Sequence, residues 1–373
     1  LCAVLTAGAY ICIRRIEEPR GDMSGEAEAE KGAADTEPPV KASRGRRIVR
    51  RLATTVVVAA LLIVFGLPWL LSFAITKAGT RPDERALTHT PASYGAAFED
   101  VTFASADGNQ LSGWYLPAAV SDKHITIVLT HGLFRSRYEM LERGVELWRR
   151  GYGVLLYDLR RHGHSPAEFS TLGYAERRDV KGAMRFARER APRDRVVLMG
   201  VSMGAAATLL ATAEMEAEGQ MPPLAVVAES SFLSFADTAR HHVTRSPLPA
   251  FPFAPLLVKF TAWRLGFVPE EFDVLRAVEK VSVPVLFIGG AADERMPNAT
   301  VLEPLFAAAR HPLKDKLVVE GARHGRAFDP FEKKGEAVGA VSLAARQAYV
   351  DAVDQFIRRA AAAAAEGDTR PSR

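Results

Sequence analysis

Cysteine is almost absent from this sequence. The chain of 373 residues holds 2 cysteines, Cys2 and Cys12, both near the N-terminus. The rest of the chain therefore cannot build a disulfide framework, a cysteine-ligated zinc site or a cysteine nucleophile. Acidic and basic residues nearly balance, with a formal net charge of +4. Because the arginines cluster before an apolar run, we interpret this excess as a membrane-topology signal and expect no nucleic-acid surface.

Large apolar side chains are scarce in residues 17–43, whereas charged residues are missing from residues 52–76. Residues 1–51 are expected to form a flexible basic tail, because residues 17–43 bury too little apolar surface to offset ordering entropy. The short apolar stretch at residues 1–13 could be a truncated leader. Residues 52–76 carry no charge and are predicted to be a transmembrane helix, since about 20 residues cross about 30 Å of hydrocarbon.

The orientation of this helix follows from the basic residues before it, which are Arg44, Arg46, Arg47, Arg50 and Arg51. The positive-inside rule places the tail in the cytoplasm and the remainder outside. Two alternatives stay open. The segment could be a signal peptide cleaved after Ala74, which would give a secreted protein, or a buried core helix.

Long apolar runs do not recur after residue 98. Residues 77–98 are interpreted as a linker, residues 99–361 as one α/β domain, and residues 362–373 as a disordered tail. In the domain, β-rich runs alternate with amphipathic helical ones, which predicts a mostly parallel sheet with helices on both faces. An opening hairpin is expected around an Asp-Gly turn, followed by strands at 125–130, 153–157, 196–199, 225–228, 283–288 and 316–319.

One interval is too long for a simple crossover between strands. Residues 231–280 contain an aromatic and proline-rich stretch from Pro247 to Trp263. Long segments at a sheet's carboxyl edge are usually functional or mobile, so we interpret this one as a helical lid that determines substrate selectivity. A purely structural insertion is the alternative.

The sequence Gly200-Val201-Ser202-Met203-Gly204 follows an apolar strand and precedes a run of small residues typical of a helix. A G-x-S-x-G turn in this position holds a serine in strained geometry at the sheet's edge, which makes Ser202 the candidate nucleophile. The N–H of Met203, at the helix N-terminus, is expected to stabilise an oxyanion. A serine that only caps the helix is the alternative.

A serine hydroxyl needs a base, and His324 is the candidate among the 9 histidines. It lies in a loop of small residues after the last predicted strand, at the same edge of the sheet. Asp293 follows the preceding strand and completes the chain order Ser, Asp, His. We expect it to orient the imidazole, with its neighbour Glu294 as the alternative.

The loop after the first parallel strand, Thr130 to Phe134, is expected to supply a second oxyanion donor, the N–H of Leu133. His131 is expected to support this loop. The polar run from Asp158 to Ser165 should brace the same turn and is assigned no chemistry. Glu229 is expected to serve a local structural role.

Taken together, these motifs resemble the α/β-hydrolase family over roughly residues 99–359. The resemblance rests on His131-Gly132, the run Asp158 to Ser165, the elbow around Ser202, Asp293 in D-x-x-x-P, and His324-Gly325. The chain looks most like the membrane-anchored, peptidase-S33-like and Bem46-like branch. That resemblance implies a serine hydrolase without metal or cofactor. Arg160-Arg161 stands where that branch commonly has Arg-Gly.

The functional hypothesis is hydrolysis of an ester, thioester or amide bond by a Ser202, Asp293 and His324 triad through an acyl-enzyme intermediate. A lid rich in aromatic residues beside a membrane favours a small-molecule or lipid-like substrate with an apolar acyl chain, so esterase, lipase or thioesterase chemistry is preferred to peptidase chemistry. The rivals are a catalytically silent scaffold of the same fold and a C–C hydrolase or perhydrolase with the same triad.

Overall fold

The computed structural model describes residues 44–77, 79–119, 123–330 and 340–368. Most of the predicted N-terminal tail and the last five residues therefore lie outside the described residues. By its internal contacts the chain divides into two units, residues 1–55 and residues 56–373. The first unit is represented in the structure by the beginning of one helix, and the second contains the sheet.

The N-terminal helix comprises α1 (Arg44–Leu61), a π-helical turn, η1 (Leu62–Gly66), and α2 (Leu67–Thr76). Among the described residues it is the one helix, 33 residues from Arg44 to Thr76, that is long and apolar enough to cross a membrane. The prediction that residues 44–51 belong to a flexible tail is wrong. Arginine is a good helix former, and the apolar run beside it extends the helix over these residues.

The second unit is built around an eight-stranded sheet in the order β1-β2-β4-β3-β5-β6-β7-β8. β1 and β2 form the predicted antiparallel hairpin, β2 also pairs antiparallel with β4, and the remaining neighbours are parallel. The prediction of a mostly parallel α/β sheet is confirmed. The strands are β1 (Glu99–Ala104), β2 (Gln110–Leu116), β3 (Ile125–Thr130), β4 (Gly153–Tyr157), β5 (Arg195–Val201), β6 (Ala225–Glu229), β7 (Val285–Gly290) and β8 (Lys314–Val319).

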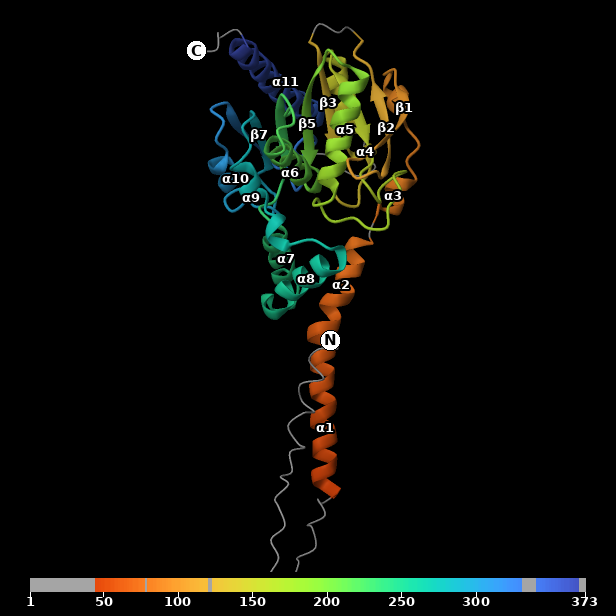
Figure 1. Ribbon diagram of the computed structural model, residues 1–373, viewed down its shortest axis with the longest axis vertical. Helices are drawn as coiled ribbons and strands as arrows, with labels where there is room; N and C mark the ends of the chain where they lie inside the picture. Colours follow the sequence, from red (N-terminus) through yellow and green to blue (C-terminus); the bar gives the residue numbers. More distant parts are fainter. Residues whose placement is uncertain (1–43, 78, 120–122, 331–339, 369–373) are drawn as a thin grey trace, which may run out of the picture. The chain divides into compact units, whose positions relative to one another are not determined.

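Helices cover both faces of this sheet (Figure 1). The apolar side chains of α4 (Arg137–Arg149) and α11 (Ala340–Asp368) join one core cluster with β3, β4 and β5. On the other face lie α5 (Glu176–Arg190), α6 (Met203–Ala217), α9 (Val274–Val278) and α10 (Leu302–Ala308). β3, β4, β6 and β7 are buried along their whole length, as strands covered on both faces must be.

The C-terminal helix does not end where the sequence suggested. α11 continues to Asp368, so the prediction of a disordered tail from residue 362 is wrong for residues 362–368. The reason is local, because residues 360–365 are all alanine, the residue with the highest helix propensity.

The segment predicted as a linker, residues 77–98, contains two short helices and is bonded to the domain. α3 (Pro82–Arg85) and the 3-10 turn η2 (Pro91–Tyr94) lie within it. The buried carboxylate of Glu84 accepts hydrogen bonds from Ser136 N–H at 2.7 Å and Ser136 Oγ at 2.9 Å. Thr80 Oγ1 donates to Arg135 O at 2.9 Å. The loop after β3 therefore holds this segment in place.

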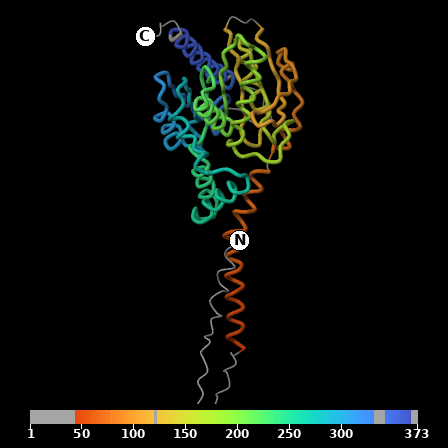
Figure 2. Tube along the Cα trace, viewed as in Figure 1, coloured from red at the N-terminus to blue at the C-terminus, as the bar shows by residue number. Residues whose placement is uncertain are grey.

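The interval after β6 contains α7 (Phe235–Thr244), α8 (Ala250–Leu265), the 3-10 turn η3 (Pro269–Glu271) and α9. Figure 2 shows α8 beside α2, although almost 200 residues separate them in sequence. The α2 side chains that pack on this region are Leu67, Leu71 and Ile75, which recur at helical spacing. The second half of the predicted membrane helix is therefore also a packing partner of the predicted lid.

Candidate active site

Ser202 lies in a sharp turn between β5 and α6. Its backbone has φ 53° and ψ −115°, a conformation that costs a non-glycine residue free energy. The turn is possible only because glycines flank it. A Cβ on Gly200 would lie 2.4 Å from the Gly204 backbone, and one on Gly204 would lie 2.3 Å from Thr130 O. The G-x-S-x-G sequence thus folds into the strained strand-to-helix turn that it predicts.

The three predicted side chains meet at the carboxyl edge of the sheet. His324 Nε2 lies 2.8 Å from Ser202 Oγ, and His324 Nδ1 lies 2.9 Å from Asp293 Oδ2. They follow β5, β7 and β8, whose carboxyl ends lie at one edge because these strands are parallel. The His324 side chain is 16% exposed and that of Asp293 only 1%. The carboxylate is thus shielded, while the imidazole remains accessible.

Asp293 is held as a carboxylate. Its Oδ1 accepts hydrogen bonds from the N–H groups of Arg295 at 3.0 Å and Met296 at 2.9 Å. Burial raises the pKa of Asp293, but the hydrogen bond and the charge interaction with His324 outweigh burial and hold it below its ordinary value. The alternative residue, Glu294, is 78% exposed and pairs instead with Arg245 at 2.9 Å. Geometry therefore favours Asp293 as the partner of His324.

A buried ion pair supports the loop that carries His324. Glu229, at the end of β6, contacts Arg143 Nη2 at 3.2 Å and accepts a hydrogen bond from Tyr349 OH at 2.7 Å. It also accepts from Ala327 N–H at 3.0 Å, while Arg143 donates to Gly325 O at 3.2 Å. Two groups of this cluster thus bond the backbone just after His324. Sequence reasoning gave Glu229 a structural role but missed Arg143 and Tyr349, for which no local motif exists.

Ser230 is a second residue that the sequence did not single out. It follows Glu229 with φ 50°, and its Oγ accepts a hydrogen bond from Gly325 N–H at 3.2 Å. Its hydroxyl also contributes to the low pKa of Asp293, after His324 and the backbone of Met296. Ser230 therefore connects the aspartate loop with the histidine loop.

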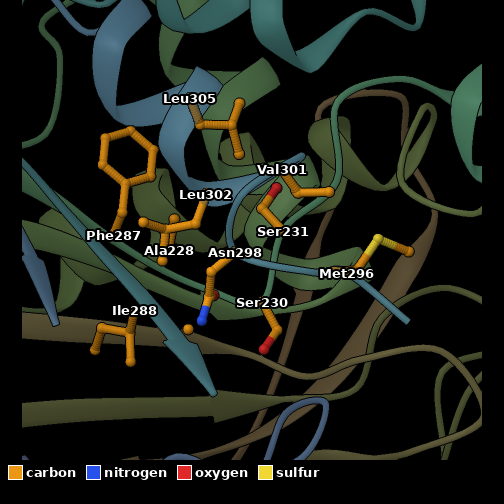
Figure 3. A pocket seen from close by; sticks show the side chains of 11 residues that line it. Ala228, Ser230, Ser231, Phe287, Ile288, Met296, Asn298, Val301, Leu302 and Leu305 are labelled. Atoms are coloured by element: carbon orange, nitrogen blue, oxygen red, sulfur yellow. The ribbon is translucent and has the colours of Figure 1, made fainter. Parts of the chain in front are cut away.

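A small cavity lies between β7 and α10 (Figure 3). It has a volume of about 10 Å³, roughly the space of one water molecule. Ser230, Ser231 and Asn298 line it, and the buried atoms Ser231 Oγ and Asn298 Oδ1 have no hydrogen-bond partner among the described residues. Its size makes it too small for a substrate.

The loop expected to supply Leu133 N–H is fixed by side chains on both sides of that residue. Gly132 N–H donates to Glu139 Oε2 at 2.7 Å, and Phe134 N–H donates to His162 Nε2 at 3.3 Å. Within the described residues, this network engages the N–H groups next to Leu133 but not that of Leu133 itself. Gly132 is also close to Ser202, since an added Cβ would lie 3.5 Å from Ser202 Cβ.

Two buried histidines, each fixed in one tautomer by its hydrogen bonds, hold this loop in place. His131 Nε2 accepts a hydrogen bond from Leu159 N–H at 3.0 Å, so its Nδ1 must carry the proton donated to Gly132 O at 2.7 Å. His162 has the same arrangement, since Nε2 accepts from Phe134 N–H and Nδ1 lies 2.9 Å from Arg160 O. Burial lowers the pKa of His131 to about 3 and also lowers that of His162. Both side chains therefore stay neutral.

The unusual Arg160-Arg161 pair has a structural consequence. Arg161 adopts φ 67°, the left-handed conformation that glycine prefers. Its guanidinium donates to Lys77 O at 3.0 Å and to Ala167 O at 3.2 Å. Arg160 instead pairs with buried Asp179 at 2.7 Å. An arginine in place of glycine thus costs backbone strain but binds the residue directly after α2.

Comparison with known proteins places this geometry in a family. Residues 121–242 match the family described as serine aminopeptidase, S33. The chain is 31% identical over 231 residues to the uncharacterized protein Rv2307c of Mycobacterium tuberculosis, covering 61% of this chain and 73% of that protein. It is 24% identical to the α/β-hydrolase domain-containing protein WAV2 of Arabidopsis thaliana, covering 60% and 71% of the two chains.

Among solved structures, the esterase Pf2001 of Pyrococcus furiosus matches with a TM-score of 0.57 and 22% identity, covering 76% of this chain and 97% of that one. This likeness concerns the fold. Together with the sheet order, the serine elbow and the sequence matches, it shows that the chain belongs to the α/β-hydrolase family.

Proposed function

We propose that the protein is a serine hydrolase that cleaves an ester, thioester or amide bond through an acyl-enzyme intermediate. The observation that carries this proposal is the continuous chain of hydrogen bonds from Ser202 Oγ through His324 to Asp293, at 2.8 Å and 2.9 Å. The serine is held in strained geometry and the carboxylate is held ionised. These are the properties that a nucleophile and its orienting acid require.

In the proposed reaction, Ser202 Oγ attacks the carbonyl carbon while His324 Nε2 accepts the hydroxyl proton. Asp293 accepts the hydrogen bond from Nδ1–H and stabilises the imidazolium. The N–H groups of Leu133 and Met203 stabilise the oxyanion. His324 then transfers its proton to the leaving group. Water, deprotonated by the same imidazole, then attacks the acyl carbon. The bond between that carbon and Ser202 Oγ breaks, His324 returns the proton to Oγ, and the carboxylic acid leaves.

We further propose an apolar acyl substrate and a membrane-anchored enzyme whose domain faces away from the cytoplasm. Apolar α2 and α8 side chains beside the sheet's carboxyl edge support the first point. Five arginines between residues 44 and 51 support the orientation. Signal cleavage after Ala74 would remove Leu67 and Leu71, which pack on the lid region, so retention of the helix is favoured.

The test is covalent labelling of the full chain with a fluorophosphonate probe, together with hydrolysis of short and long acyl esters. We expect an adduct on Ser202 and ester hydrolysis, both abolished in Ser202→Ala. A folded protein that forms no adduct would instead favour a catalytically silent scaffold. Protease accessibility in intact cells tests the orientation, and protection of residues 99–361 would contradict it.

A further inference from the structure

The membrane helix and the lid helix share a surface that limits where a bilayer can lie. Arg51 is the last charged residue before Lys77, so the apolar layer cannot begin before Leu52. At 1.5 Å per residue, the roughly 20 residues needed to cross about 30 Å extend from Leu52 to Leu71. Any tilt of the helix increases the number required.

Packing against the lid region begins well before Leu71. Val64, Leu67 and Leu71 contact the apolar cluster that contains the α8 residues Phe253, Leu257 and Val258. The Trp69 ring contacts Phe260 and Trp263 at centroid distances of 5.6 Å and 5.5 Å. Val64 is 12 residues after Leu52, roughly 18 Å into the layer and past its centre. A bilayer around this helix must therefore also surround α8.

The surface of α8 has the composition that such a location requires. Residues 238–269 contain no Asp or Glu and four Lys or Arg. Phe251 and Trp263 are 80% and 74% exposed, and Leu70 on α2 is 66% exposed. Exposed aromatic side chains of this kind are typical of membrane interfaces. The one exposed cation within α8, Lys259, is long enough to extend towards lipid headgroups.

The other charged residue on α8, Arg264, finds its hydrogen-bond partners at the expected boundary of the apolar layer. Arg264 donates to Ser72 O at 2.9 Å and to the Thr76 hydroxyl, and lies 3.6 Å from the Phe73 ring centroid. Ser72 is 20 residues after Leu52, which corresponds to about 30 Å along the helix. The guanidinium therefore lies where hydrocarbon gives way to headgroups.

The next residues lead directly to the edge that carries the triad. Ser170 N–H donates to Thr76 O at 2.8 Å, and Arg81 N–H donates to Phe134 O at 3.0 Å. These contacts belong to loops that follow β4 and β3, whose carboxyl ends lie at the same edge as Ser202 (Figure 1). The candidate active site thus faces the layer that surrounds α2.

We propose that α8, together with α2, inserts into the non-cytoplasmic leaflet and presents the active site to acyl chains within the bilayer. The occupant of the exposed apolar surface is lipid. This inference rests on the proposed membrane anchor and deepens the proposed function, because it identifies a membrane-resident acyl compound as the substrate class.

The test places an environment-sensitive fluorophore on single cysteines in the full chain, with Cys2 and Cys12 replaced by serine. The protein is reconstituted into phosphatidylcholine and phosphatidylglycerol vesicles that carry nitroxide-labelled acyl chains. Phe251→Cys and Trp263→Cys report on α8. Leu62→Cys, 67% exposed, reports on the membrane span, and Met221→Cys, 72% exposed and before β6, is the matched control for an exposed apolar residue.

We expect quenching at positions 251 and 263 to be at least about twofold stronger than at position 221, with position 62 also quenched. Quenching at 62 with water-like signals at 251 and 263 would overturn the inference and leave the anchor intact. Protection of 251 and 263 from both lipid and aqueous quenchers, with self-quenching between molecules, would assign the surface to a second copy.

A third contrary result would concern the membrane span and can be distinguished from a failure of the proposed hydrolase activity. Absence of quenching at 62 would refute the membrane span and this inference together. Fluorophosphonate labelling of Ser202 in the same samples reports on the chemistry independently. All four labelled positions are exposed and lie outside the candidate active site, so their replacement leaves its packing intact.

Discussion

Buried His131 provides a quantitative prediction about pH and stability. Its folded-state pKa is about 3, against an ordinary value of 6.5. Between these values the unfolded chain binds a proton that the folded protein does not bind, so stability falls as the pH falls. From pH 7 to pH 5 the expected loss from His131 is about 2 kcal/mol. His162, whose pKa is also lowered, adds a loss of the same sign.

The measurement is urea unfolding of the full chain in detergent at pH 7 and pH 5, followed by circular dichroism. Each protein gives one difference in unfolding free energy between the two pH values. For His131→Gln this difference should be about 2 kcal/mol smaller than for the unaltered chain. The matched control is His164→Gln, because the His164 side chain is 78% exposed and its replacement should leave the difference unchanged.

The pH difference, rather than absolute stability, is the quantity to compare, because His131→Gln also removes two hydrogen bonds at every pH. Equal pH differences for His131→Gln and the unaltered chain would refute the conclusion that this imidazole is neutral because it is buried. A pH difference in His164→Gln as small as in His131→Gln would show that the reduction does not depend on burial of the replaced imidazole.

Three further predictions concern the site. Asp293→Asn should slow fluorophosphonate labelling of the nucleophile by about 10⁴-fold, because the imidazole loses its correct tautomer, and an unchanged rate would contradict the proposed triad. Gly204→Ala should prevent accumulation of folded protein, since its Cβ would lie 2.3 Å from a backbone oxygen, whereas Gly66→Ala, with nothing within 4 Å, should be tolerated. Arg143→Met should lower the unfolding free energy by about 3–5 kcal/mol by leaving Glu229 buried and unpaired. The double variant with Glu229→Gln should recover part of that loss in urea unfolding, and additive losses would contradict the pairing.

Much of the parallel sheet could be predicted because the residue pattern that marks a buried strand is local in the sequence. Buried strands appear as short runs of β-branched and apolar residues, and β3 and β4 begin and end where the sequence indicated. Parallel strands then bring the residues after their carboxyl ends to one edge. The proximity of Ser202, Asp293 and His324 follows from that topology, without any knowledge of distances.

Long-range contacts between polar residues could not be predicted in this way. Arg143 and Glu229 are separated by 86 residues and lie on different elements, and neither belongs to a motif. The docking of α8 on α2 was missed for another reason. An apolar helix face is equally compatible with lipid and with protein, so the run from residue 52 to 76 indicated a membrane helix but not its second partner.

The bonds that Arg264 makes to Ser72 and Thr76 also restrict rotation of α2 about its own axis. These bonds fix which face of α2 is turned towards α8. Leu62 and Leu70 are 67% and 66% exposed and remain free for a neighbouring apolar helix, whereas Leu67 and Leu71 pack against the lid region. If two copies associate through α2, the face of α2 that packs on α8 is excluded from the contact, which limits how their α/β domains can be oriented. Cysteine crosslinking should then succeed at positions 62 and 70 and fail at positions 67 and 71.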